Sequence, residues 1–267
     1  PRSTLFPYTT LFRSYSVMGT VTSFHDKITF LPASVVKSYA GNEEKTILGH
    51  SVTSVFGYRT DGIFQNQEEV TAHATQPGKG IGRLRYVDMN GDGVINTYDQ
   101  DWIGTTLPDF EYGINAEVSY KNFTFSVFGQ GVSGKTVSDG LKGSTDFASG
   151  QGMNFGTRVL QAWTPQNTSS DIPMLSAVNR NNETRSSNYM LVNGAYFKLR
   201  NATLAYTLPR EISQKIRVGM LRVYVMGENF LLVKPTGKGT FTGPDPETPG
   251  TLYPRPVSLT MGINVTL

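Results

Sequence analysis

A run of twelve residues, from Asp88 to Asp99, places oxygen-bearing side chains at a spacing that could hold a metal ion. They stand at positions 1, 3, 5, 9 and 12 of the run DMNGDGVINTYD. Position 6 is Gly93, where a chain that wraps a cation must turn sharply, and Val94 at position 7 would contribute its backbone carbonyl. Calcium takes six to eight oxygen ligands, and this is the spacing of calcium-binding loops. We therefore predict a structural Ca²⁺ site made by Asp88, Asn90, Asp92, Val94, Asn96 and Asp99.

This loop departs from the EF-hand pattern in two ways. Asp99 stands at position 12, where EF-hands carry a bidentate glutamate, and no helical pattern precedes Asp88. The run therefore indicates an isolated structural loop or a dockerin-like variant, and not a helix-loop-helix sensor. The alternative is a turn rich in Asx and Gly residues that folds without a metal, and the sequence leaves both open.

Residues for catalysis are harder to find. Asp245 with Glu247, and Glu68 with Glu69, could act as acid/base pairs in a glycoside-active enzyme, but their spacing does not fix the distance between carboxylates. Solvated loop charge is the interpretation that we favour for them. The sequence has no G-x-S-x-G, P-loop, G-x-G-x-x-G or H-E-x-x-H motif and no cysteine nucleophile. We expect no enzymatic activity.

Charge and composition narrow the class of protein. The formal charge is +3, and it falls to 22 − 21 = +1 without Arg2 and Arg13, so nothing favours nucleic-acid binding. Glycine (28 residues), tyrosine (13) and phenylalanine (15) accompany a charged fraction of only 17%, a balance typical of strands and turns. No apolar run is long enough for a membrane helix, whereas a membrane strand needs only about 10 alternating residues. The sequence predicts an all-β fold.

The clearest strand pattern lies at the C-terminus, where apolar residues alternate with small polar ones from Val257 to Leu267. Alternation of the same kind recurs in the ranges 113–120, 123–129, 197–208 and 221–228. In a soluble sandwich the apolar face would meet a dry core, and in an outer-membrane barrel it would meet lipid. Repetition of the pattern favours the barrel, for which we expect about eight to ten strands from the ~10-residue strand length.

Connections between these strands alternate between short and long. Residues 121–122 and 209–219 make short links, whereas 130–193 and 234–256 are long and rich in Gly, Pro, Asn, Ser and Thr. Outer-membrane barrels have short periplasmic turns and long extracellular loops. Aromatic residues near the strand ends would suit an interfacial girdle, although strand propensity explains them equally well; they are Tyr112, Tyr120, Phe123, Tyr196, Tyr206 and Phe230.

The opening segment, residues 1–14, is treated separately. It has neither the apolar stretch nor the cleavage site of a signal peptide, and from Thr4 to Ser14 it looks like the translation of a sequencing adapter. We expect residues 1–14 to be an adapter scar and residues 15–267 to be the folded part, the C-terminal portion of a β-barrel.

Several short motifs, read in order, resemble the C-terminal half of the SusC/RagA family of TonB-linked outer-membrane proteins. The first are GYRTDGIFQ at 57–65, GRLRYVDMNGDGVI at 82–95, PDFEYG at 108–113 and FGQG at 128–131. AYFKLRNATLAYTLP at 195–209, LRVYV at 221–225, ENFL at 228–231 and Asp245-Pro-Glu247 continue the resemblance. It covers the chain from about Gly49 to the end.

The resemblance implies both a fold and a function. Members form antiparallel transmembrane β-barrels with long extracellular loops, located in the outer membrane as multi-pass proteins. They take energy from the TonB complex through an N-terminal part that we expect this chain to lack. They import oligosaccharide or peptide cargo together with a SusD-like surface lipoprotein. The rival interpretation is a secreted or surface-attached, calcium-stabilised β-sandwich that binds carbohydrate.

Overall fold

The computed structural model describes residues 14–36, 45–147, 152, 154–178, 180–250 and 253–267. Its regular structure is mostly antiparallel β-strand, and its α-helices are four to six residues long. Within the described ranges, no helix has both the length and the apolar character that a membrane crossing demands. The all-β prediction is confirmed.

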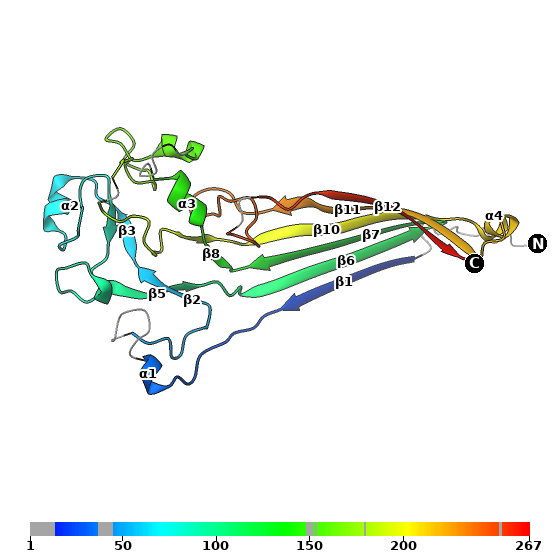
Figure 1. The fold of residues 1–267 in the computed structure, drawn as a ribbon, viewed down its shortest axis with the longest axis horizontal. Coiled ribbons are helices and arrows are strands. Elements are labelled where there is room, and N and C mark those ends of the chain that lie inside the picture. Colours follow the sequence, from blue (N-terminus) through cyan, green and yellow to red (C-terminus); the bar gives the residue numbers. More distant parts are fainter. Residues whose placement is uncertain (1–13, 37–44, 148–151, 153, 179, 251–252) are drawn as a thin grey trace, which may run out of the picture.

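Six long strands lie side by side in one elongated antiparallel sheet (Figure 1). Along the sheet the order is β1-β6-β7-β10-β11-β12, so every neighbouring pair is also consecutive among these six strands. Such an up-and-down order is that of antiparallel barrel walls. The strands span Ser14–Thr22 (β1), Phe110–Tyr120 (β6), Phe123–Ser133 (β7), Tyr196–Thr207 (β10), Met220–Val233 (β11) and Ser258–Thr266 (β12).

Five of these strands match the ranges in which alternation was read from the sequence. The sixth, β1, was not anticipated, and it begins at Ser14, the last residue of the segment expected to be a scar. The rest of that segment lies outside the described residues. The long sheet has fewer strands than the eight to ten expected, because the long connections contain short strand pairs of their own.

Short and long connections fall at opposite ends of the sheet, as the sequence predicted. At one end, residues 121–122 link β6 to β7, and a short segment with helix α4 (Arg210–Lys215) links β10 to β11. Figure 1 shows α4 and the C-terminus at this end and the long connections gathered at the other. This is the asymmetry of an outer-membrane barrel, with short turns on one side and long loops on the other.

Registered pairing of the six strands places apolar residues in rows across the whole sheet. One row runs through directly opposed residues of all six strands: Tyr15, Val118, Phe125, Leu204, Val225 and Met261. Successive residues of a strand point to opposite faces, so this row defines one face, which we call the outer face. The next row on the same face contains Val17, Ala116, Val127, Ala202, Gly227 and Leu259.

The outer face carries no aspartate, glutamate, lysine or arginine along the six strands. The charged residues in regular register all point to the opposite, inner face; these are Glu111, Glu117, Lys198, Arg222 and Glu228. Outer-face side chains are nevertheless exposed, with Leu204 at 52% and Met261 at 73% of full exposure. A sheet of a water-soluble protein would not leave such an uncharged apolar surface uncovered.

The alternative of a two-layer sandwich is therefore wrong. In the described part of the chain, the long sheet is accompanied only by three two-stranded sheets, and the outer face stays exposed. Most buried apolar residues lie instead in the long connections, among them Phe64, Tyr86 and Trp163. The protein has a buried core in its loops and an exposed apolar face on its sheet, the reverse of a soluble β-protein.

Aromatic residues mark both ends of the outer face. Phe123 and Tyr206 contact each other at the short-turn end, with ring centroids 4.8 Å apart. Tyr112 and Phe197 stack at the long-loop end, 6.2 Å apart. The girdle predicted from the sequence includes one residue wrongly: Tyr196 is buried and points to the inner face, because it follows the alternation of β10 in step with Lys198.

The long connections fold into a compact loop body beyond one end of the sheet (Figure 1). Its three two-stranded sheets pair β2 with β5, β3 with β4, and β8 with β9. The short strands are Ser54–Tyr58 (β2), Thr60–Ile63 (β3), Leu84–Tyr86 (β4), Gln100–Thr105 (β5), Thr136–Ser138 (β8) and Leu191–Asn193 (β9). The short helices are Ala33–Val36 (α1), Gln67–Ala72 (α2), Gly140–Thr145 (α3) and the 3₁₀ turns Thr97–Asp99 and Thr157–Gln161.

An apolar cluster and a buried polar network hold the loop body together. The cluster contains Tyr58, Ile63, Leu84, Tyr86, Ile95 and Trp163. Beside it, the buried amide of Gln76 donates to Leu84 O at 2.9 Å and to Asn181 Oδ1 at 2.6 Å, and its Oε1 accepts from Tyr86 N. Residues from the β1–β6 and β7–β10 connections thus share one core, which gives the predicted metal loop a fixed base at Ile95.

Candidate functional site

The predicted metal loop, residues 88–99, lies in the loop body between β4 and β5. Its turn depends on two glycines in the left-handed region, Gly91 at φ 75° and Gly93 at φ 80°. Only glycine adopts this conformation without strain from a Cβ atom. On its far side, Ile95 is buried, and its N–H donates to Thr75 O at 2.9 Å, so the loop is anchored to a neighbouring segment.

Carboxylates of the loop organise its backbone. Asp88 accepts from Gly91 N at 2.7 Å and from Gly93 N at 2.8 Å, one bond to each oxygen. Asp92 Oδ1 accepts from Val94 N at 2.8 Å, and its Oδ2 accepts from the Asn90 amide at 3.0 Å. These hydrogen bonds, that of Asn90 first, lower the pKa of Asp92, so this side chain is charged at neutral pH.

Asp99 has a different environment from the other acids of the loop. It is fully buried, and its two oxygens accept from Met89 N at 2.9 Å and Asn96 N at 2.7 Å. With Asn96, which accepts from Tyr98 N, it forms a capping box around a 3₁₀ turn. Both oxygens are therefore turned to the backbone, and Asp99 holds the two ends of the loop together.

The turn geometry of the loop fits a calcium ion, whereas its side chains supply only part of the ligand set that the ion needs. Among the residues that the structure describes, no three His, Cys, Asp or Glu side chains form a group that could hold a metal ion. An ion on this loop would draw on the half-buried Asp88 and the exposed Asp92, on the Asn90 and Asn96 amides, and on the Val94 carbonyl. The calcium site stays a prediction.

A second group of functional side chains lies on the inner face, where the β11–β12 connection folds back over β10. Lys198 of β10 donates to Asp245 Oδ2 at 2.5 Å and to Glu247 Oε2 at 2.6 Å. The side chains of Lys198 and Asp245 are each only 5% exposed. A loop residue is therefore joined to the sheet by a charged pair that excludes water.

Further cations surround the two carboxylates. Arg200 donates to Glu247 Oε1 at 2.5 Å, and Arg255 lies 3.8 Å from Asp245 and 3.6 Å from Glu247. Burial alone would raise the pKa of Glu247, but hydrogen bonds from Arg200 and Lys198 outweigh it and lower the pKa to about 2. Lys135 donates to Pro246 O at 3.4 Å and completes what we call the basic cluster: Lys135, Lys198, Arg200 and Arg255.

This arrangement corrects the interpretation of Asp245 and Glu247 as solvated loop charge. Both are tied to cations, and the low pKa of Glu247 makes it unsuitable as a general acid. Glu69 is also engaged, since it pairs with Arg85 at 3.0 Å at the start of α2, while Glu68 is exposed as expected. In the sequence, Lys198 and Arg200 alternate with Phe197 and Leu199, but their partners stand 47 residues away and carry no local signal.

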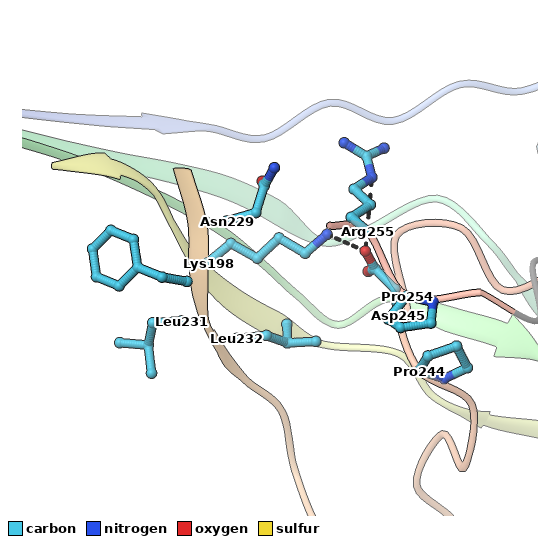
Figure 2. A pocket seen from close by; sticks show the side chains of 9 residues that line it. Lys198, Asn229, Leu231, Leu232, Pro244, Asp245, Pro254 and Arg255 are labelled. Carbon is cyan, nitrogen blue, oxygen red and sulfur yellow. Dashed lines mark hydrogen bonds and ion pairs between the residues drawn. The ribbon is translucent and has the colours of Figure 1, made fainter. Parts of the chain in front are cut away.

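A cavity of about 230 Å³ lies next to the basic cluster (Figure 2). Figure 2 shows Lys198 pointing to Asp245, with Arg255 on the other side of the same carboxylate. The remaining wall comes from two segments, Asn229–Leu232 of β11 and the prolines Pro244 and Pro254 of the following loop. The cavity therefore combines an arginine and an amide with apolar surface.

The sheet and its loops together define a segment of a transmembrane β-barrel. An uncharged, exposed outer face, a polar inner face, and the division into short turns and long loops are the properties of that class.

Comparison with known proteins places the segment more closely. The chain is 30% identical over 250 residues to TonB-dependent receptor P26 of Formosa agariphila, and this alignment covers 90% of the chain and 25% of the receptor. TonB-dependent receptor P3 of the same organism is 33% identical over 205 residues, 74% of this chain and 19% of the receptor. A structure of the RagAB peptide transporter matches with a TM-score of 0.61 at 22% identity, over 82% of this chain and 23% of that one. No family model matches the sequence.

The chain is therefore a SusC/RagA-like TonB-dependent receptor segment, as its motifs indicated. It spans between about a fifth and a quarter of the length of the curated relatives that it matches. TonB-dependent receptors are outer-membrane β-barrels, and the relatives are named as receptors and a transporter, not as enzymes.

Proposed function

We propose that this chain forms part of the barrel wall and extracellular loops of a TonB-dependent importer of oligosaccharides or peptides. The inner face would line the aqueous lumen, and the outer face would contact outer-membrane lipid. Energy would come from the TonB complex through a separate N-terminal part of the receptor, and a SusD-like surface lipoprotein would deliver cargo above the loop body. The similarity to TonB-dependent receptors and to the RagAB transporter supports both partners.

The segregation of charge between the two faces carries this proposal. The charged side chains of the sheet all lie on one face, while the other face is exposed, apolar and bounded by aromatic residues. Contact with water on the first face and with lipid on the second would explain this division. A charge facing hydrocarbon costs roughly 2–4 kcal/mol at the midplane, so such a face must stay uncharged. The polar face has no such requirement.

A pair of neighbouring cysteine substitutions tests the orientation. The sequence contains no cysteine, so each introduced thiol in this segment is unambiguous. Leu204→Cys lies on the outer face and Thr203→Cys on the inner face of the same strand. In the full-length receptor that this proposal implies, embedded in outer membranes, we expect a water-soluble maleimide to label Thr203→Cys and a lipid-soluble one to label Leu204→Cys. Equal labelling of both positions by the water-soluble reagent would overturn the proposal.

We also propose that the 88–99 loop binds Ca²⁺ and thereby stiffens the loop body. The ligand spacing, the left-handed glycines and the exposure of Asp92 support this. In this role Asp88, Asn90, Asp92, Val94 and Asn96 would supply oxygens. Asp99 would keep the loop closed through its two backbone hydrogen bonds.

A further inference from the structure

Three cations pair with Asp245 and Glu247, and one of them is less tightly engaged than the other two. Lys198 and Arg200 hold their carboxylates at 2.5 to 2.6 Å, whereas Arg255 stays at 3.6 to 3.8 Å from the same groups. The Arg255 side chain is 44% exposed, compared with 5% for Lys198 and 17% for Arg200. Its guanidinium can therefore turn toward a ligand without breaking a short hydrogen bond.

The ion-pair network beside the cavity has a positive excess. Lys198, Arg200 and Arg255 pair with only two carboxylates, Asp245 and Glu247, so the balance of the network is 3 − 2 = +1. Arg255 lines the cavity and is the most exposed of the three cations, so an anion entering the cavity would meet it first.

The rest of the lining suits an anion attached to an apolar group. Asn229 sits in the left-handed region at φ 56°, where β11 departs from regular pairing with β10. In Figure 2 its amide and the Arg255 guanidinium flank the end of the Lys198 side chain. Leu232, Pro244 and Pro254 give the apolar part of the wall.

We propose that this cavity is a subsite for a carboxylate carried by the cargo, with Arg255 as its ion-pair partner and Asn229 as a second hydrogen-bond donor. Arginine binds a carboxylate through two parallel N–H donors, a geometry that a planar acid group matches. Asp245 and Glu247 make their short hydrogen bonds to Lys198 and Arg200, and their longer ion pairs with Arg255 leave that guanidinium able to bind the ligand. The inference rests on the proposed import function, because it places the subsite on the lumen side of the wall.

Two sources could supply such a carboxylate, the C-terminus of a peptide or a uronate of an acidic glycan. Detergent-purified full-length receptor is titrated with a tripeptide bearing a free C-terminus and with the same tripeptide as its amide. A parallel pair compares a uronate-containing disaccharide with its neutral counterpart. We expect the acid form of at least one pair to bind about tenfold more tightly than its neutral form, and the pair that shows the preference identifies the source.

Substitution of the arginine tests whether the preference arises in this cavity. Arg255→Gln is expected to abolish it, while the matched control Arg210→Gln, an exposed arginine of α4 at the other end of the sheet, is expected to keep it. Asn229→Gly removes the amide and still permits the positive φ, so it reports on the cavity even if Arg255→Gln fails to assemble. It should reduce the preference without abolishing it.

The proposal is overturned if acid and neutral forms bind equally in both pairs, or if the preference survives Arg255→Gln. Binding in detergent does not depend on which face of the sheet meets lipid. The labelling of Leu204→Cys and Thr203→Cys reads that orientation separately, so failure of the subsite and failure of the import function are distinguishable.

Discussion

Lys198 Nζ and Asp245 Oδ2 lie 2.5 Å apart and join a strand of the barrel wall to a loop residue 47 positions later. Both side chains are almost completely buried. A buried ion pair is weak evidence of stabilisation by itself, but the removal of one partner leaves the other charged and without water. Here the cation serves two carboxylates, so the loop between β11 and β12 depends on Lys198 more than on either acid.

Lys198→Met should release this loop from the inner face. Asp245 would lose its closest cation, and we expect a loss of roughly 3–5 kcal/mol in the free energy of unfolding, as for other broken buried pairs. Denaturant unfolding of the purified receptor measures the loss, and limited proteolysis between residues 234 and 257 reports the loop directly. Lys238→Met, an exposed lysine of the same loop, is the control. Equal stability of the two variants would show that the pair does not hold the loop.

Acid should loosen the same contact through Glu247. The pKa of Glu247 is about 2 in the folded protein, below its ordinary value of 4.5, so the folded state favours the charged carboxylate. The stabilisation is therefore fully present above about pH 4.5 and is lost as the pH falls through 2. We expect Glu247→Gln to melt at a lower temperature than the unmodified receptor at about pH 6, and at the same temperature at about pH 2. A difference that persists in acid contradicts this assignment.

A charge on the outer face should impair assembly, whereas the same charge on the inner face should not. Leu204→Arg would place a guanidinium in the row that runs across all six strands, at a cost of roughly 2–4 kcal/mol near the bilayer midplane. Thr203→Arg would point to the inner face, where Arg222 and Glu228 already lie. The measurement is the amount of folded receptor in the outer membrane. Similar yields for the two variants would argue against a lipid-facing surface.

Local periodicity in the sequence was enough to predict the long strands. The alternation from Val257 to Leu267 and its repeats fixed five of the six strands and the two classes of connection. Strand β1 was not predicted because it adjoins the segment set aside as a scar. Tyr196 was assigned to the wrong face because a position near a strand end does not say which face a residue takes. Pairing register supplied that information.

The candidate site was harder to predict, because much of it is formed by residues that are distant in sequence. The calcium loop could be proposed because its ligands fall within twelve consecutive residues. The basic cluster could not, because Lys198 and Asp245 come together only when the β11–β12 connection folds back onto β10. Sequence alone therefore suggested solvated carboxylates where the structure has a buried ion-pair network.

Calcium should bind the 88–99 loop and raise the stability of the loop body. An ion that binds only the folded state stabilises it by about 2.7 kcal/mol at a hundred times its dissociation constant. We expect isothermal titration of chelator-treated receptor with CaCl₂ to show a binding event at this loop, and the melting temperature to rise with calcium. Asp88→Asn should weaken both effects, because Asp88 would be the first ligand and also orders Gly91 and Gly93. Glu68→Gln, an exposed acid of the loop body, should leave them unchanged. Identical melting with calcium and with chelator would mean that Asp88, Asp92 and Asp99 shape the turn by hydrogen bonding alone.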